Sequence, residues 1–326
     1  ISACLVGSEM CIRDRDYLYE LFLSDVSSTL DGPVCAIDLD GVLETDCLGF
    51  SAAPPAGAMA LRCLLRHGYR VVLASGRSVE EVRDRCIAWH LAGGVAEYGA
   101  AVFHAPTQVV NELLGPLQRE HLESLRHHIQ SLRDVFVDQD YARSVRAYRL
   151  QGDRRRHSLN ADSAGKLLRQ TGLQDEVRAI HGERQTDFVP ARVDKWQGLE
   201  SLLRQLSPDY PWPLLAIGDS ESDLQMLGKA TMAWAPANAQ PALRHAGVRI
   251  ARRPLALGLS EAVRAVTGHW PGACSICAPI APATESPSLL DVLRALDGGR
   301  RSKARSLAVV SGALVVAHAR CVLERY

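Results

Sequence analysis

The sequence predicts an α/β protein with a parallel sheet, into which a separate α+β domain is inserted. Between residues 33 and 98, and again after residue 190, apolar strand-like runs alternate with helix-like segments, as in βα units. Between about residues 99 and 190 the strand-like runs show mixed alternation, as in a half-exposed sheet. The change of pattern and its return indicate one core interrupted by an insertion.

The core elements follow from apolar runs, caps and glycines. In chain order we expect a strand at 34–39, a helix at 56–68, a strand at 69–75, helices at 78–91 and 194–206, a strand at 213–218, a helix at 221–230, and short edge strands at 231–236 and 247–251. Ser78 is expected to cap its helix, and Gly68 to close the helix before it.

The interrupting region has its own strands and helices. Strands are expected at 135–141, 144–150, 176–182 and 184–190, and helices near 117–132 and 163–172. We therefore divide the chain into a first core part at 16–98, an inserted domain at 99–189, a second core part at 190–268, and a Pro-rich linker with a helical extension at 269–326. Residues 1–15 resemble a translated sequencing adapter or a disordered tail, and are excluded from fold reasoning.

Composition excludes some classes of function. Lys plus Arg and Asp plus Glu both total 37, so no overall charge excess favours nucleic acid or a membrane surface. The apolar segment 307–319 is shorter than the roughly 18 residues of a spanning helix, and a packed or interfacial helix is expected there. No disulfide framework is legible in the nine cysteines, which favours a cytoplasmic setting.

One cysteine pair has metal-ligand spacing. Cys274 and Cys277 form a CxxC, but a structural zinc site needs two more ligands and none follows at a readable spacing. The sequence therefore assigns no role to this pair.

Two carboxylates and a glycine follow the first strand. Asp38 and Asp40 stand two residues apart, so both side chains are expected on one side of the chain, and Gly41 allows a turn or a close ligand. Ligands bind at the carboxyl ends of strands in open α/β sheets, which makes a cation site one interpretation. A surface turn that closes a strand is the other.

Further polar residues follow other core strands. Ser75, Gly76 and Arg77 end the second strand, where a hydroxyl and free N–H groups suit a phosphate oxygen, although Ser-Gly turns are common. Asp219 and Asp223 follow the strand at 213–218 with a spacing that places both on one helix face. Carboxylate oxygens suit Mg²⁺, while helix capping by Asp219 or Ser220 is the structural alternative.

Lys195 lies in the first turn of the helix at 194–206, where a cation opposes the helix dipole and so indicates a functional requirement. In this order the four motifs resemble those of the haloacid dehalogenase-like (HAD) hydrolase superfamily, over residues 33 to about 266. The resemblance implies a Rossmann-like core with a cap domain, and phosphoryl-transfer chemistry.

The resemblance also implies roles for individual residues. Asp38 is implied as the nucleophile, and Asp40 as the general acid and base. The implied phosphate-binding residues are Gly41, Ser75, Gly76 and Lys195. Asp38, the backbone carbonyl of Asp40, and Asp219 are implied as Mg²⁺ ligands, with Asp223 as a ligand or its support.

The spacing of the motifs resembles one branch of the superfamily. The insertion falls between Ser75 and Lys195, as in the sugar-phosphatase-like (sucrose-phosphate phosphatase or Cof-like) branch. Tyr98, Ser222 and Val42 depart from the residues usual there. Arg77, Tyr98, Arg143 and Arg184 are candidate substrate contacts, with a solvated face as the alternative for the arginines of the inserted domain.

We therefore expect a Mg²⁺-dependent phosphatase that acts on a small phosphorylated metabolite, a sugar or polyol phosphate. The alternatives are a phosphomutase of the same superfamily and a non-catalytic binding or regulatory protein. The extension at 269–326 is a possible docking element for a protein partner, and neither nucleic acid nor a membrane is expected as a partner.

Overall fold

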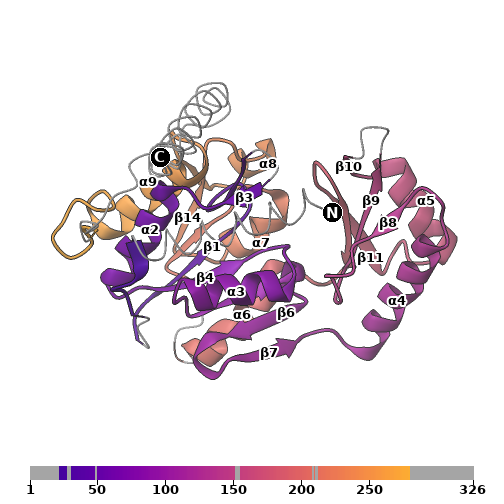
Figure 1. Cartoon of the computed structure of the whole chain (residues 1–326), viewed down its shortest axis with the longest axis horizontal. Coiled ribbons are helices and arrows are strands. Elements are labelled where there is room, and N and C mark those ends of the chain that lie inside the picture. Colours follow the sequence, from indigo (N-terminus) through magenta and orange to yellow (C-terminus); the bar gives the residue numbers. More distant parts are fainter. Residues whose placement is uncertain are drawn as a thin grey trace, which may run out of the picture. The chain divides into compact units, whose positions relative to one another are not determined.

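The computed structural model describes residues 22–27, 31–47, 50–150, 155–207, 209 and 212–279 (Figure 1). These residues form two compact units, and we describe each by itself. Unit 1 takes its described residues from Ile1–Val71, Ala88–His90 and Trp212–Tyr326, and unit 2 takes its own from Val72–Ile87 and Leu91–Pro211.

Unit 1 contains a parallel sheet. Its strands are β1 (Val34–Ile37), β13 (Leu215–Ile217), β14 (Met232–Ala235) and β15 (Arg249–Ile250), and they lie side by side in that order. All four residues of β1 are buried, as the continuous apolar run predicts. The expectation that both last strands are edge strands is wrong for β14, because it pairs with β13 on one side and β15 on the other.

Helices of unit 1 pack beside this sheet. They are α2 (Pro55–Arg66), α7 (Leu224–Leu227), α8 (Pro241–Arg244) and α9 (Leu255–Thr267), and a small antiparallel pair joins β2 (Thr45–Cys47) to β3 (Phe50–Ala52). Helix α2 buries Ala58, Leu61 and Leu65 at helical spacing and packs against α9 (Figure 1). Arg62, on the same helix, is only 2% exposed.

Unit 2 contains a mixed sheet. β4 (Arg70–Ala74), whose first two residues belong to unit 1, runs parallel to β5 (Gly93–Ala96), and β6 (Ala101–His104) and β7 (Val109–Glu112) continue the sheet antiparallel. We expected the inserted region to begin at residue 99. The chain reverses at the 3₁₀ helix η2 (Glu97–Gly99), β6 pairs with β5 and β7 pairs with β6, and η3 (Ala105–Thr107) joins β6 to β7. Helix α3 (Val79–Ala88) lies between β4 and β5 in the chain, and helix α6 (Lys195–Leu206) packs against β5 and β6.

The α+β domain expected within the core is confirmed. Its strands are β8 (Phe136–Val137), β9 (Val145–Leu150), β10 (Arg156–His157), β11 (Val177–His181) and β12 (Thr186–Pro190), all antiparallel in the order β10-β9-β12-β11 with β8 beside β9. Helices α4 (Pro116–Gln130) and α5 (Ala161–Thr171) supply Leu122, Leu125, Leu167 and Leu168 to a core that includes Phe188.

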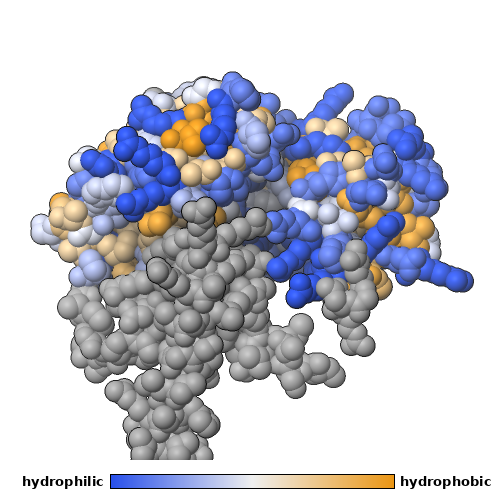
Figure 2. All heavy atoms as spheres, turned by 90° about the horizontal axis from the view of Figure 1, so that it is seen from above, coloured by the Kyte–Doolittle hydropathy of each residue, from blue (hydrophilic) through white to orange (hydrophobic). Residues whose placement is uncertain are grey.

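Hydrophilic residues cover most of the described surface visible in Figure 2. Among the described residues, no helix is long and apolar enough to cross a membrane. The segment 307–319 lies outside the described residues. Of the extension expected from residue 269, the structure describes the first part, to residue 279. We expected a linker there, but Arg66 Nε donates a hydrogen bond of 3.0 Å to the Ile276 carbonyl, which fixes this part against α2.

Candidate active site

Three carboxylates meet in unit 1. Asp38 follows β1 and is 4% exposed, and its backbone N–H donates to the carbonyl of Ile217 at 2.9 Å. This bond continues the pairing of β1 with β13 and therefore brings Asp38 to the end of both strands, where Asp219 begins the next turn. Asp38, Asp219 and Asp223 each offer a carboxylate oxygen, and the three oxygens lie within 4.8 Å of one another.

Asp223 is held by the turn that carries it. Its Oδ2 accepts hydrogen bonds from the backbone N–H of Asp219 at 3.1 Å, from that of Ser220 at 3.0 Å, and from Ser220 Oγ at 2.8 Å. Ser220 and Asp223 thus form a capping box at the 3₁₀ helix η4 (Glu221–Asp223). The capping alternative for Ser220 is confirmed, and it fixes Asp223 beside Asp219 rather than competing with a site there.

Gly41 lies against the same carboxylates. Its φ is +78°, and a Cβ at this position would lie 2.0 Å from Asp219 Oδ2, so only glycine fits. Asn238 fixes the loop from the other side, because its Nδ2 donates to the carbonyl of Gly41 at 2.9 Å and its Oδ1 accepts from the Leu255 N–H at 2.7 Å. Sequence reasoning missed Asn238, since one asparagine in a loop carries no motif.

The carboxylate group fits a magnesium ion. Mg²⁺ binds oxygen at about 2.0–2.1 Å in an octahedron, which places its ligand oxygens about 2.9 Å apart when adjacent and about 4.2 Å apart when opposite. Oxygens within 4.8 Å of one another need only a small contraction to reach these separations. Asp38, Asp219 and Asp223 are therefore a suitable donor set.

Asp40 lies apart from this carboxylate group. It is exposed, and its backbone forms an isolated bridge with Glu44 in the turn after β1. Because β1 ends at Ile37, the regular alternation of a strand does not extend to Asp38 and Asp40. The carboxylate of Asp38 is buried while that of Asp40 faces solvent, which gives the two acids different environments.

Ser75 and Lys195 are both buried in unit 2. Ser75 follows β4, its N–H donates to the Val95 carbonyl at 3.0 Å, and its Oγ accepts from the Arg77 N–H at 3.1 Å. Lys195 is the first residue of α6 and is 2% exposed, and Asp194 caps this helix by accepting from the Gln197 N–H at 2.9 Å. A buried lysine at a helix N-terminus is unusual for a structural role alone.

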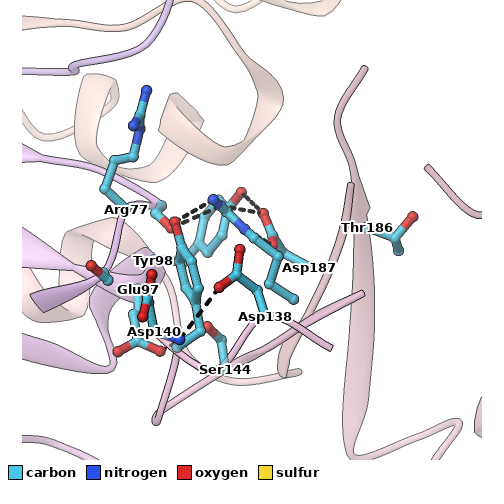
Figure 3. Close-up of polar contacts among 12 residues, drawn as sticks. Arg77, Glu97, Tyr98, Asp138, Asp140, Ser144, Thr186 and Asp187 are labelled. Atoms are coloured by element: carbon cyan, nitrogen blue, oxygen red, sulfur yellow. Dashed lines mark hydrogen bonds and ion pairs between the residues drawn. The ribbon is translucent and has the colours of Figure 1, made fainter. Parts of the chain in front are cut away.

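Tyr98 connects the core of unit 2 to the inserted domain (Figure 3). Its ring packs so closely on Gly76 that a Cβ there would lie 2.3 Å from Tyr98 Cζ. Its hydroxyl donates to Asp187 Oδ2 at 2.7 Å, and Arg146 Nε donates to the other oxygen of Asp187 at 2.6 Å. Tyr98 therefore fills the space beside Gly76 with a side chain that is tied to β12.

Arg146 links this group to a second tyrosine. Its guanidinium lies 3.8 Å from the centre of the Tyr141 ring and hydrogen-bonds the Tyr141 hydroxyl, which donates to Glu81 Oε2 at 3.2 Å. Burial raises the pKa of Tyr141, so the hydroxyl keeps its proton. Burial lowers the pKa of Arg146, but the Asp187 carboxylate more than offsets this and holds the arginine charged.

Three other predicted substrate contacts lie in different surroundings. Arg77 pairs with Glu81 at 2.7 Å and points away from the Tyr98–Asp187 pair in Figure 3. Arg143 lies 3.7 Å from Glu97 Oε1 and 3.5 Å from Glu112 Oε2. Arg184 is exposed in the turn between β11 and β12. The structure brings none of these three into the Tyr98–Arg146–Asp187 group.

Glu97 is fully buried where the backbone is strained. Glu97 and Tyr98 have positive φ angles of 47° and 60°, and Glu97 Oε2 accepts from Ser144 Oγ and from the Arg143 N–H, both at 2.8 Å. Burial raises the pKa of Glu97, although these donors and the Arg143 charge oppose the shift. The loop at η2 therefore places the titratable carboxyl of Glu97 against Arg143 and Ser144 of the inserted domain.

We expect this group to make folding stability pH-dependent. Because the folded-state pKa is raised, the folded protein binds the proton more tightly, so stability is greatest below the usual glutamate pKa of about 4.3 and falls as pH rises through the raised value. Urea unfolding as a function of pH should show this decline in the wild type and a smaller one in Glu97→Gln. An unchanged slope in Glu97→Gln would contradict the assignment, and the exposed Glu183→Gln is the control.

One segment of the chain matches a known protein family. Residues 170–253 match the family model described as haloacid dehalogenase-like hydrolase. Over this range the chain is similar to haloacid dehalogenase-like hydrolases. The matched range contains Lys195, Asp219 and Asp223, so it includes the third and fourth motifs of the sequence and the carboxylate turn of unit 1.

Three known proteins are similar to this chain over 72% of its length. A phosphoglycolate phosphatase of Methanothermobacter thermautotrophicus is 26% identical over 72% of this chain and 98% of its own length. The sucrose-phosphatase of Synechocystis, solved with sucrose and phosphate, has a similar fold, with a TM-score of 0.53, 18% identity and coverage of 72% of this chain and 98% of that one. A haloacid dehalogenase-like hydrolase of Bacteroides thetaiotaomicron gives a TM-score of 0.54, with 17% identity, 72% of this chain and all of that one.

Proposed function

We propose that this chain is a haloacid dehalogenase-like hydrolase, a Mg²⁺-dependent phosphatase that hydrolyses a small phosphomonoester through an aspartyl-phosphate intermediate. The observation that carries the proposal is the group of Asp38, Asp219 and Asp223, whose carboxylate oxygens lie within 4.8 Å of one another at the ends of β1 and β13. A buried carboxylate in such a group is both a nucleophile and a cation ligand.

Asp38 and Asp40 have environments that suit two different tasks. Buried Asp38 is held by its backbone bond to Ile217 and accepts the Leu39 N–H at 2.8 Å, which fixes the carboxylate that attacks phosphorus. Asp40 is exposed, and it gives a proton to the leaving oxygen and later takes one from water. A magnesium ion held by the three carboxylates would supply positive charge against the phosphate oxygens.

Unit 2 supplies the remaining residues of the motif set. We assign phosphate binding to Ser75, Gly76 and Lys195, and to Gly41 of unit 1. The Ser75 hydroxyl is fixed by the Arg77 N–H, and Lys195 is buried at the first position of α6. Fixed hydroxyl, amide and ammonium groups stabilise the charge that develops on a transferring phosphoryl group.

The substrate we propose is a sugar or polyol phosphate. The presence of a complete α+β domain between β7 and α6 supports a substrate with a recognisable leaving group, because an insertion of this kind can exclude water and contact that group. The name of the Methanothermobacter relative adds phosphoglycolate, a small phosphorylated acid, to the compounds that should be compared. We therefore propose a compact, oxygen-rich phosphomonoester as the substrate class.

A phosphate-release assay tests the proposal. The purified chain should release phosphate from at least one member of a panel of hexose phosphates, polyol phosphates, sucrose phosphate and phosphoglycolate. Release should require Mg²⁺ and stop when the metal is chelated. Isomerised sugar phosphate without free phosphate would instead indicate a phosphomutase, and Mg²⁺ binding without turnover of any compound would indicate a binding or regulatory role.

A further inference from the structure

A second cluster of potential metal ligands lies in unit 1, made of sulfur and nitrogen donors. Cys63, His67, His269 and Cys277 each offer one ligand atom, and the four atoms lie within 4.8 Å of one another. Cys274 is a fifth neighbour, since its Sγ lies 3.3 Å from His67 Nε2 and 3.5 Å from Cys277 Sγ. We refer to these five residues as the Cys/His cluster.

The spacing of the donors matches a tetrahedral ion. Zinc binds nitrogen at about 2.0–2.1 Å and sulfur at about 2.3 Å, so donor atoms at the corners of a tetrahedron lie about 3.3–3.8 Å apart. The two imidazole nitrogens, His67 Nε2 and His269 Nε2, are 3.1 Å apart, and the two contacts of Cys274 Sγ measure 3.3 and 3.5 Å. These distances are close to the edges of one tetrahedron.

The orientation of His269 also suits a metal ligand. Its Nδ1 lies 2.9 Å from the backbone carbonyl of Trp270, and because a carbonyl oxygen only accepts, Nδ1 carries the proton. In the neutral ring Nε2 then presents a lone pair to the cluster. A hydrogen bond from one ring nitrogen to a backbone carbonyl is the usual way in which proteins orient a metal-binding histidine.

The Nε2 atom of His67 has two neighbours that a single proton cannot satisfy together. His67 Nε2 lies against both His269 Nε2 and Cys274 Sγ. Without a metal, this nitrogen must share a single proton between the two neighbours, or accept from a weak thiol donor while facing another lone pair. A single cation would accept electron pairs from all these atoms at once.

The backbone that carries the cluster is fixed by other contacts. Cys63 lies in the last turn of α2 and His67 is the C-cap residue of that helix, one turn further along, where its backbone N–H donates to the Cys63 carbonyl. Arg62 on the same helix donates through Nε to the Cys277 carbonyl at 3.1 Å and through Nη2 to the Ala278 carbonyl at 2.8 Å. The Gly272 N–H donates to Cys277 Sγ at 3.3 Å. The fold thus holds both halves of the cluster in place.

We propose that the Cys/His cluster binds one zinc ion as a structural site. His67, His269 and Cys277 are three of its ligands, and the neighbouring thiols Cys63 and Cys274 compete for the fourth position. Two thiolates and two imidazoles are the donor set of a tetrahedral zinc site, and four protein ligands leave no position open for catalysis. The ion would join the segment after α9 to α2.

This donor set differs from that of the carboxylate group described above. Magnesium prefers oxygen ligands and an octahedron, whereas thiolate and imidazole ligands select zinc and similar metals. Unit 1 therefore presents two sites with different metal preferences. The zinc proposal is independent of the phosphatase proposal, because zinc content and stability can be measured without any substrate.

Elemental analysis of the full chain tests the proposal. Protein purified under reducing conditions without chelators should contain about one zinc ion per chain, and the double variant His67→Ala/Cys277→Ala should contain background levels only. Replacement of zinc by cobalt(II) should give the intense visible absorption of a tetrahedral thiolate site. Cys86→Ala and His245→Ala, a buried thiol and an exposed imidazole outside the cluster, should retain the metal and are the matched controls.

A Zn²⁺ titration of the wild-type protein tests the same proposal without relying on variants, which could fail to fold. After removal of metal with a strong chelator, added Zn²⁺ should bind at a 1:1 ratio in competition with a chromophoric chelator and raise Tm, while added Mg²⁺ should not. A folded apoprotein that binds no zinc would overturn the proposal. So would zinc that remains in the double variant, or a reversible Cys274–Cys277 disulfide in a chain that takes up no metal.

Discussion

Replacement of Asp38 by Asn is expected to lower kcat for phosphomonoester hydrolysis by about 10⁴-fold or more. An amide oxygen is a poor nucleophile and carries no charge, so the variant loses both the attacking atom and one of three cation ligands. Phosphate release at saturating substrate and Mg²⁺ measures the effect. Because Asn has the shape of Asp and keeps an oxygen that can accept the Leu39 N–H, the fold should be kept.

Asp31→Asn is the matched control, since Asp31 is an exposed carboxyl that precedes β1, at the opposite end of the strand from Asp38. It should leave kcat unchanged. Rapid-quench trapping with labelled substrate should detect phosphoenzyme in the wild type and none in Asp38→Asn. Turnover by Asp38→Asn at the wild-type rate would contradict the assignment of the nucleophile, whichever substrate is used.

Replacement of Arg146 by Met is expected to cost about 3–5 kcal/mol of folding free energy. The variant leaves the Asp187 carboxylate, which is 1% exposed, without its ion-pair partner, although the Tyr98 hydroxyl still donates to it. A buried charge without its ion-pair partner is strongly destabilising, and the cation–π contact with Tyr141 is lost as well. Urea unfolding monitored by circular dichroism measures the change.

Two further variants make this prediction specific. Arg156→Met removes an ion pair with Asp138 in the same sheet, at 2.8 Å but with the arginine half exposed, so it should cost less than about 1 kcal/mol. The double variant Arg146→Met/Asp187→Leu removes both charges and should recover most of the lost stability. If Arg146→Met and Arg156→Met cost the same, the buried pair would not have the importance assigned to it.

Local sequence patterns were sufficient to predict the core. Continuous apolar runs predicted β1, β4 and β13, because strands buried on both faces need no polar alternation. The acidic, glycine and serine residues after those runs then located Asp38, Ser75 and Asp219, since strand ends are where such residues serve a ligand. The structure confirms that Asp38, Asp219 and Asp223 come together.

Features that depend on the reversal of the chain could not be predicted. The turn at η2 uses positive φ angles at Glu97 and Tyr98, and neither residue type signals such a conformation. From the sequence, the segment that forms β6 was therefore assigned to the inserted domain, which was predicted to begin at residue 99. Where that domain begins, and which of its residues contact a substrate, stay predictions.

The second group of side chains was missed for a different reason. No further ligand follows Cys277 at a readable spacing, because the other donors precede it: His269 lies nearby, but Cys63 and His67 lie more than 200 residues earlier. Only the packing of α2 against α9 brings them together. A CxxxH on one helix face is a weak signal alone, and it gains meaning when a distant CxxC is placed beside it.

Unit 1 is assembled from both ends of the described chain, and this has a consequence for synthesis on the ribosome. Cys35 pairs with Leu215, and Arg62 bonds both Phe22 and Ala278, so β1 and α2 emerge long before their partners exist. Unit 2 is nearly continuous in sequence and is complete once residue 211 has left the exit tunnel. At about 5–20 residues per second, β1 waits on the order of ten seconds or more for β13. β1 and α2 are therefore synthesised well before the segments that they contact in unit 1.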